Sequence, residues 1–503
     1  MDLLTHIAQG FEVALTWQNL GYAFIGCFLG TLIGVLPGIG PVATISMLLP
    51  TTFVLPPVSG LIMLAGIFYG AQYGGSTTAI LVNLPGESTA VVTCIDGHQM
   101  ARQGRAGAAL TVAALGSFFA GTVGTLIIAG LAMPLADFAL KFSSPEYFSL
   151  MVLGLIASVV LASGSVVKAM AMVVIGLLLG IVGTDVNSGM PRFTFGYSEL
   201  SEGITFVAIS MGIFGYAEII SNLQHKMNRD IVAKKITGLG LTKDDVKRSV
   251  PAILRGTALG SVLGFVPGGG ILLATFASYM MEKKLAKDPS RFGKGAIEGV
   301  AGPESANNAA SQTSFIPMLT LGLPSTASMA LMIWAMTVHQ VQPGPMVMTK
   351  NPDLFWGLIA SMWIGNAMLV ILNLPMIGLW VKLLRVPYSF LFPAILLFCC
   401  IGVYSINNSS FDVLLTVVFG FIGYLFIKLE CEPAPLLLGF VIGPMMEENL
   451  RRTMLLSRGD PQVFIDRPIS FGMLIAAALL LLMLVIPAVK KKRAEAFVDG
   501  EVK

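Results

Sequence analysis

Residues 30–40 read GTLIGVLPGIG, and residues 260–270 read GSVLGFVPGGG. The two segments share the pattern GxxxGxxPGxG, and 230 positions separate Pro37 from Pro267. A Pro-Gly-x-Gly inside an apolar stretch breaks a helix, because proline lacks a backbone donor and glycine favours non-helical angles. In lipid, broken backbone is tolerated where protein or a water-filled cavity satisfies the freed groups. Two matched copies therefore predict re-entrant, functional breaks rather than plain kinks packed through GxxxG.

The composition around these segments is that of a membrane protein. Of 503 residues, 55% are hydrophobic and 12% charged, and the mean hydropathy is +0.80. Segments such as Leu110–Ala132, Leu354–Trp380 and Ile469–Val489 are long enough to cross a hydrocarbon core of about 30 Å as helices. A soluble fold is excluded, and most of the chain is expected to contact membrane lipid. The N-terminus carries no basic stretch before its first apolar run, so we do not expect a cleaved signal peptide.

A second motif is also duplicated. Residues 84–90 read LPGESTA and residues 323–327 read LPSTA, and each copy follows a run of hydroxyl side chains. A half-helix that begins after Pro85 or Pro324 would direct its free amides, and the positive end of its dipole, toward an anion. The alternative is ordinary N-capping and hydroxyls bonded to their own helix. The predicted substrate-binding residues of both motifs are Gly38, Gly40, Ser76, Thr77, Thr78, Asn83, Ser88, Thr89, Gly268, Gly270, Thr313, Ser314, Ser325 and Thr326.

Charged residues inside the apolar stretches are few, so each is a functional candidate. Glu87 lies in the first Leu-Pro motif, and Glu304 leads into the second together with Asn307 and Asn308. Carboxylate and amide oxygens at a broken helix suit a sodium ion, or a proton on one of the carboxylates. These four residues are therefore the predicted cation-coupling positions. For Glu304 the alternative is a loop at the membrane interface, since Gly302-Pro303 resembles a loop.

The basic residues lie between the apolar segments. They concentrate in the central stretch 224–250 and in the tail after Pro487, and the positive-inside rule assigns both to the cytoplasm. Short basic loops beside membrane spans do not indicate nucleic-acid binding. The second half then crosses an odd number of times, so the halves are predicted to be inverted repeats, as in many secondary transporters. The predicted boundaries are 1–223 for the first repeat, 224–250 for a cytoplasmic linker, 251–450 for the second repeat, 468–489 for an extra C-terminal helix and 490–503 for a cytoplasmic tail.

Several chemistries lack their sequence signatures. HExxH, a P-loop and GxSxG are missing, and the five cysteines form no spaced pair suited to zinc. We therefore predict that the protein is not an enzyme, and an intramembrane enzyme is the weaker rival. A channel is the stronger rival, because broken helices also build selectivity filters. A stand-alone organic-anion carrier also stays open.

The sequence resembles the large membrane subunit of the tripartite tricarboxylate transporters, the TctA family. The resemblance covers nearly the whole chain and is carried by residues 34–41, 73–93, 264–270, 302–330 and 434–452. It implies an all-α polytopic permease of a bacterial inner membrane that takes up citrate-like tricarboxylates or other organic acids. It also implies a periplasmic solute-binding protein (TctC-like), a small membrane subunit (TctB-like), and uptake driven by a sodium or proton gradient. Neither hairpin motif contains Arg or Lys, so amides, hydroxyls and a co-bound cation are expected to neutralise the substrate.

Overall fold

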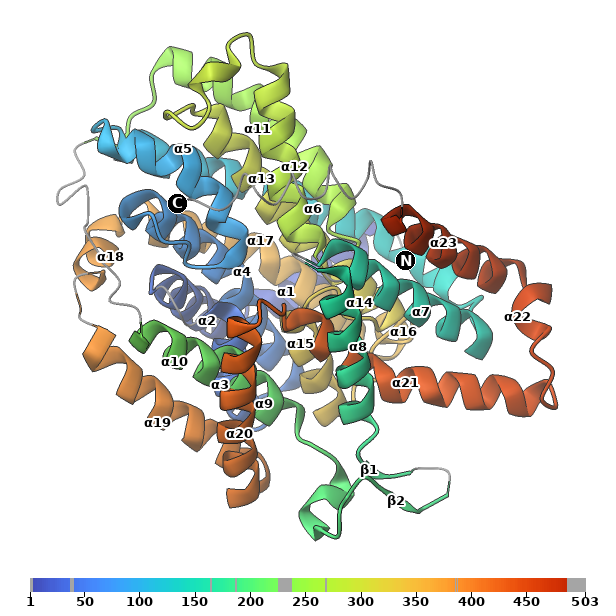
Figure 1. Cartoon of the computed structure of the whole chain (residues 1–503). Coiled ribbons are helices and arrows are strands. Elements are labelled where there is room, and N and C mark those ends of the chain that lie inside the picture. Colours follow the sequence, from blue (N-terminus) through green and yellow to red (C-terminus); the bar gives the residue numbers. More distant parts are fainter. Residues whose placement is uncertain are drawn as a thin grey trace.

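The computed structural model describes residues 3–36, 40–162, 165–185, 188–224, 238–266, 269–384, 386 and 388–485. Within these ranges the protein is helical apart from one two-stranded hairpin (Figure 1). Up to residue 224 the elements are α1 (Leu3–Ala14), α2 (Trp17–Val35), α3 (Gly40–Thr52), α4 (Pro57–Val82), η1 (Ser88–Ala90), α5 (Val91–Arg102), α6 (Ala106–Ala139), α7 (Ser144–Leu161), α8 (Val166–Gly180), β1 (Gly183–Thr184), β2 (Pro191–Arg192), η2 (Ser198–Glu202), α9 (Phe206–Ser210), the π-helix η3 (Met211–Tyr216) and α10 (Ala217–Gln224).

The second half continues the helical pattern, and six helical segments of the described chain are long and apolar enough to cross a membrane. These are α2, α6, α7, the continuous segment from α9 to α10, α17 and α20. The all-helical, multi-pass prediction is thereby confirmed. The later elements are α11 (Lys243–Leu263), α12 (Gly270–Leu285), η4 (Pro289–Arg291), α13 (Glu298–Thr313), α14 (Phe315–Leu321), α15 (Ala327–Val338), α16 (Val347–Lys350), α17 (Pro352–Asn373), α18 (Ile377–Leu383), α19 (Tyr388–Asn407), α20 (Ser410–Lys428), α21 (Ala434–Leu456), α22 (Val463–Asp466) and α23 (Pro468–Val485).

Helices α2 and α4 pack in direct backbone contact, and glycine makes this contact possible. A Cβ atom on any of three α2 glycines would lie 2.3 to 2.4 Å from a carbonyl oxygen of α4, which is too close for a side chain. The contacts advance in the same direction along both helices, so the helices run parallel. The pairs are Gly26 with Met63, Gly30 with Ile67 and Gly34 with Ala71.

Helices α11 and α13 repeat this packing in the second half. A Cβ on the α11 glycines would lie 2.2 to 2.4 Å from carbonyl oxygens of α13. Each glycine lies 230 positions after its counterpart, as from Gly30 to Gly260, and each partner lies 239 positions after its own, as from Ile67 to Ala306. Close packing through GxxxG is therefore present in both copies. The pairs are Gly256 with Gly302, Gly260 with Ala306 and Gly264 with Ala310.

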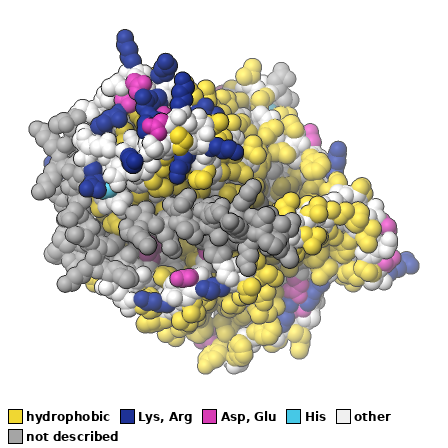
Figure 2. All heavy atoms as spheres, turned by 45° about the horizontal axis from the view of Figure 1, so that its top comes forward, with side chains coloured by type: hydrophobic (Ala, Val, Ile, Leu, Met, Phe, Trp, Pro, Cys, Tyr) yellow, Lys and Arg dark blue, Asp and Glu magenta, His cyan; other side chains and the backbone are white. Residues whose placement is uncertain are grey.

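Charge is distributed unevenly over the surface. Figure 2 shows Lys and Arg side chains gathered over the end formed by α5 and α11, above a flank that is mostly hydrophobic. Exposed basic residues at this end include Arg102 at the end of α5, Lys243 and Lys247 at the start of α11, and Lys284 at the end of α12. The central linker is described from residue 238 onward, and residues 486–503 also lie outside the described ranges.

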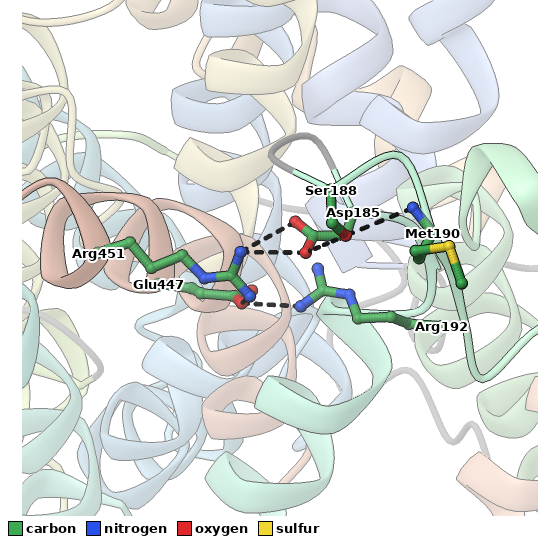
Figure 3. Close-up of polar contacts among 6 residues, drawn as sticks. All are labelled: Asp185, Ser188, Met190, Arg192, Glu447 and Arg451. Carbon is green, nitrogen blue, oxygen red and sulfur yellow. Dashed lines mark hydrogen bonds and ion pairs between the residues drawn. The ribbon is translucent and has the colours of Figure 1, made fainter. Parts of the chain in front are cut away.

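The β-hairpin is held against α21 by an alternating charge cluster (Figure 3). Arg451 binds both oxygens of Asp185, at 3.1 and 3.0 Å, and Glu447 at 2.6 Å. Glu447 also binds Arg192 on β2 at 2.7 Å. Helix α21 continues through Glu447 and ends at Leu456. The arginines at 451 and 452 thus belong to a helix end that carries the hairpin.

The extra C-terminal helix α23 packs against α7. Arg467, just before α23, donates to the buried carboxylate of Glu146 at 2.5 Å. Glu146 also accepts from the backbone and hydroxyl of Ser143 and so completes a capping box on α7. Ser149 and Ser470 are hydrogen bonded at 2.7 Å one turn further in. The added helix is therefore tied to the first half of the chain through two polar contacts, of which the one between Ser149 and Ser470 is buried.

Candidate functional site

Each Leu-Pro motif lies where one helix stops and another begins. Asn83 ends α4 with φ 59°, and Gly322 ends α14 with φ 71°. Asn and Gly adopt this left-handed conformation more readily than other residues. Pro85 and Pro324 follow, and the next helical turns begin at Ser88 and Ala327. The helix breaks predicted at both motifs are confirmed.

A cavity of about 430 Å³ lies between the two Leu-Pro segments. The first half contributes Gly40 and residues 86–89 to its wall, and the second half contributes Gly269 and residues 325–328. Two segments that are more than 230 positions apart in the sequence therefore face one space. None of the described residues that line this cavity is Lys or Arg. Gly38 and Gly268, predicted at the Pro-Gly breaks, lie outside the described residues.

The first turn of α15 forms part of the cavity wall. The hydroxyl of Thr326 accepts a hydrogen bond from the backbone N–H of Met329 at 3.2 Å, which is an N-cap. The backbone N–H groups of Ala327 and Ser328 belong to the first turn of α15, where the helix has no carbonyl that could accept from them. Together with the helix dipole they make this wall electropositive without a charged side chain. An anion with carboxylate oxygens suits such a wall.

Glu87 and Thr89 line the cavity on the side of the first half. The Thr89 hydroxyl lies 2.9 Å from Glu87 Oε1 and also 2.9 Å from Gln72 Oε1 on α4. The second oxygen of Glu87, Oε2, is buried and has no hydrogen-bond partner among the described residues. Ser88 is exposed to the cavity. This side of the cavity therefore offers a hydroxyl, a carboxylate and a link to α4.

The other predicted hydroxyls are used inside the protein and lie outside the lining of this cavity. Thr78 donates to the carbonyl of Val35 at 2.8 Å, so it satisfies a carbonyl that the end of α2 leaves free. Thr313 and Ser314 donate to carbonyls one turn back, Ala309 at 3.1 Å and Ser311 at 2.7 Å. Thr77 is buried in α4 and donates to the carbonyl of Tyr73 at 3.4 Å, and Gly270 packs against the end of α11. The alternative that hydroxyls serve their own helix describes Thr313 and Ser314, whereas Thr78 serves the neighbouring helix α2.

Glu304 lies at the centre of the protein, 1% exposed, in the middle of α13. Its carboxylate accepts from Ser76 at 2.6 Å and from Thr93 on α5. The interfacial-loop alternative is wrong, because α13 runs without interruption through Gly302 and Pro303. Asn308, one turn later, donates to Ser117 on α6 at 2.6 Å and is thereby committed to helix packing.

Three carboxylates near these elements were missed by sequence analysis. Glu218 and Glu432 line the cavity. Asp96 on α5 is fully buried and accepts hydrogen bonds from the backbone N–H groups of Gly293, Gly295 and Ala296 at 2.7 to 2.9 Å, and from Tyr279. Asp96 has no counterpart in the second half, so the similarity between the two halves does not indicate it. Residues 215–218 are weakly similar to residues 444–447, and this similarity includes Glu218 but does not indicate a cavity.

The fold and the site together define a polytopic membrane protein whose two halves meet around a shared cavity. The family model of the tripartite tricarboxylate transporter TctA family matches residues 20–438, and the chain belongs to this family. It is therefore a transport protein and not an enzyme.

Two relatives come from Agrobacterium vitis. One, named "Uncharacterized 52.8 kDa protein in TAR-I ttuC' 3'region", is 59% identical over 499 residues, which cover 99% of both chains. The other, "Uncharacterized protein in TAR-II ttuC' 3'region", is 58% identical over 242 residues, which cover 48% of this chain and all of the relative. No solved structure matches the chain significantly.

Proposed function

We propose that this chain is the large permease subunit of a binding-protein-dependent secondary transporter that imports a tricarboxylate or a related organic acid. The observation that carries the proposal is the cavity of about 430 Å³ between the two Leu-Pro segments. Its wall combines the amides of the first turn of α15 with the hydroxyls of Ser88, Thr89 and Ser325. Amides and hydroxyls bind carboxylate oxygens while keeping the substrate free to leave, which a fixed Arg pair would resist.

The halves are inverted repeats with re-entrant hairpins, and the site alternates between the two sides. The packing of α2 on α4 and of α11 on α13 supports a duplicated unit. Opposite orientation is supported by α4 and its counterpart, the segment from α13 to α14, which pack antiparallel because Ser76 meets Glu304 and Phe68 meets Phe315. A symmetric relation is also supported by the two short helices after the Leu-Pro motifs. Asp96 of α5 binds the segment 293–296 between α12 and α13, whereas Trp334 of α15 packs against Phe53 between α3 and α4, with ring centroids 5.7 Å apart. Helices α5 and α15 thus each contact the connection between two helices of the other half.

Uptake is coupled to a cation, either sodium or a proton, at the positions of Glu87, Glu304, Asn307 and Asn308. The support is the burial of two carboxylates beside the cavity with no Lys or Arg among their described hydrogen-bond partners. A cation would compensate part of the negative charge of substrate and protein, and so would make simultaneous binding favourable. The sodium or proton gradient would then drive the anion inward.

The partners are a periplasmic solute-binding protein that delivers the acid and a small membrane subunit that completes the complex, in a bacterial inner membrane. Membership of a family of tripartite transporters supports both partners. The basic end over α5 and α11 faces the cytoplasm by the positive-inside rule, and the β-hairpin end then faces the periplasm (Figures 1 and 2).

Reconstitution into proteoliposomes tests this function. The chain is inserted with its small subunit, the binding protein is supplied outside, and labelled citrate and other carboxylates are offered under an imposed sodium or proton gradient. The expected result is saturable accumulation against the substrate gradient that requires the binding protein. Equilibration without accumulation would indicate a channel, and undiminished uptake without the binding protein would indicate a stand-alone carrier. Replacing sodium by choline at constant pH separates the two coupling ions.

A further inference from the structure

The β-hairpin and the segment that follows it expose large apolar side chains at the end of the molecule opposite α5 and α11 (Figure 1). Phe195 is 82% exposed, and three neighbours are each more than half exposed. These four residues are called the hairpin surface: Met190, Phe193, Phe195 and Tyr197. Exposed apolar side chains that gather in one place are typical of a site that binds another molecule.

Two phenylalanines of the hairpin surface have an unfavourable backbone conformation. Phe193 has φ 51° and Phe195 has φ 50°, in the left-handed region that glycine and asparagine adopt more readily than an aromatic residue. Both residues are more than half exposed, so packing within this chain does not account for a phenylalanine at either position. Strained residues of this kind occur preferentially at functional sites. The conformation therefore indicates that the two rings serve a contact outside the chain.

The hairpin surface lies beyond the ends of two candidate membrane spans. Thr205 directly precedes the span formed by α9 and α10, and its hydroxyl donates to Asp412 in the first turn of the span α20 at 3.0 Å. Tyr197 stacks on Phe411 in the same turn, with ring centroids 6.3 Å apart. Both spans begin at these contacts, so the segment 188–203 lies on their water side (Figure 1). Lipid tails therefore do not cover the exposed rings.

Contacts on two sides hold the hairpin surface in place. The charge cluster of Figure 3 fixes β2 on α21 through Arg192 and Glu447. On the other side, the hydroxyl of Thr184 on β1 donates to the carbonyl of Ser201 at 2.8 Å. Because the backbone is already fixed, a partner that docks here would lose little affinity to the ordering of this segment.

A second cavity, of about 750 Å³, opens beside the hairpin surface and is called the outer cavity. Residues 198–206 form one wall, and residues of α15, α20 and α21 form the others. Glu199 and Glu202 are exposed, whereas Trp334 and Phe440 are partly or fully buried. None of the described lining residues is Lys or Arg. The outer cavity therefore suits a partner that presents apolar side chains next to Lys or Arg.

The outer cavity adjoins the cavity between the two Leu-Pro segments. In α15, Ala327 lines the cavity between the Leu-Pro segments and Ala330 lines the outer cavity. In α21, Leu438 lines the first and Val441 lines the second. Both steps are three residues, so one face of each helix borders both cavities. The outer cavity thus lies about 4.5 Å farther along these helices, toward the hairpin.

We propose that the hairpin surface and the outer cavity form the docking site of the periplasmic solute-binding protein. Phe193 and Phe195 are the apolar anchors, and Glu199 and Glu202 pair with basic side chains of the binding protein. Aromatic anchors supply much of the affinity of protein interfaces, and complementary charges orient the partners. A partner within the membrane would pack on the spans, whereas the hairpin surface lies beyond their ends. The docking site rests on the proposed function, which supplies a soluble partner on this side of the membrane.

Titration of fluorescently labelled binding protein against the full chain and its small subunit in lipid nanodiscs tests the docking site. We expect Phe195→Ala to weaken binding at least tenfold, while Phe195→Tyr, which keeps the ring, retains most of the affinity. Glu199→Lys combined with Glu202→Lys should weaken binding at least tenfold at low ionic strength, and salt should reduce the difference by screening the charges. Leu456→Ala is the matched control and should bind as the wild type does, because Leu456 is 77% exposed at the far end of α21.

Uptake by the same variants is measured at rising concentrations of binding protein. Docking through these residues predicts that half-maximal uptake requires at least tenfold more binding protein, with the maximal rate unchanged. A lower maximal rate with wild-type affinity for the binding protein would overturn the docking site, because the residues would then act in transport itself. Loss of the small subunit from the purified variants would assign the surface to that subunit and would overturn the docking site as well.

The docking site and the proposed function fail in different ways. Wild-type affinity in both Phe195→Ala and the charge-reversed variant would overturn the docking site, and import by the wild-type chain with its binding protein would leave the proposed function standing. A wild-type chain that neither binds nor requires the binding protein would overturn the binding-protein dependence of the proposed function, and the docking site with it.

Discussion

Ser76 on α4 donates a hydrogen bond to Glu304 on α13 across 2.6 Å, and 228 positions of sequence separate the two residues. The same hydroxyl lies 3.0 Å from the carbonyl of Gln72 on its own helix. Sequence patterns had assigned Ser76 to the substrate and Glu304 to the cation. Their contact instead makes Ser76 a partner of the buried carboxylate, and it joins the two halves beside the candidate cavity.

Replacing Gly260 by alanine is expected to separate α11 from α13. The new Cβ would lie 2.2 Å from the carbonyl oxygen of Ala306, and backbone on both sides has to move. Overpacking of this kind costs about 1–3 kcal/mol or more. Size-exclusion profiles and thermal unfolding of the detergent-solubilised protein measure the loss. Gly21→Ala is the control, because nothing lies within 4 Å of a Cβ at that position of α2. Equal stability of the two variants would contradict the packing described.

Removing both cavity serines, Ser88→Ala with Ser325→Ala, is expected to reduce carboxylate uptake at least tenfold and to leave assembly of the complex intact. Ser88 is exposed to the cavity, and Ser325 donates to the carbonyl of Ser314 at 3.2 Å beside it. The loss of one hydrogen bond to a charged ligand amounts to about 1.5–3 kcal/mol. Initial rates in proteoliposomes measure the effect, with Ser405→Ala on α19, away from the cavity, as the control. Unchanged uptake would remove these hydroxyls from the binding site.

Asp96→Ala is expected to release the segment between α12 and α13. Three backbone N–H groups, at 293, 295 and 296, and the hydroxyl of Tyr279 would lose their common acceptor. Each unsatisfied buried donor costs about 1–3 kcal/mol, so the segment is expected to move until water satisfies these donors. Limited trypsin digestion at Lys287, Arg291 and Lys294 reports the opening.

The control for this variant is Asp288→Ala, which changes an exposed carboxylate of the same segment. Asp288 bonds to Ser290 within the segment and not to α5. Trypsin should cut Asp96→Ala at least tenfold faster than the control. Similar digestion of the two variants would mean that Asp96 does not hold the segment in place.

Several features could be predicted because they depend on local sequence. The duplicated glycines, the prolines at 85 and 324 and the apolar runs each act through the conformation of the backbone near them. Helices, breaks and the multi-pass architecture therefore followed from composition and from self-comparison. The partners of buried side chains could not be predicted. Gln72 and Asn308 are both amides in apolar stretches, yet Gln72 contacts Thr89 and Asn308 contacts Ser117 on α6, because the partner depends on which segment packs against each residue.

The sequence by itself determined that the chain is a duplicated, helix-broken membrane protein, because proline, glycine and hydrophobicity act locally and recur at a fixed interval. The tertiary structure alone decided that the two Leu-Pro motifs share one cavity, that Glu304 is buried in a continuous helix, and that Asp96 binds three backbone amides. These results depend on how α4, α5 and α13 pack against one another, and that packing brings together side chains such as Ser76, Thr93 and Glu304 that are far apart in the chain.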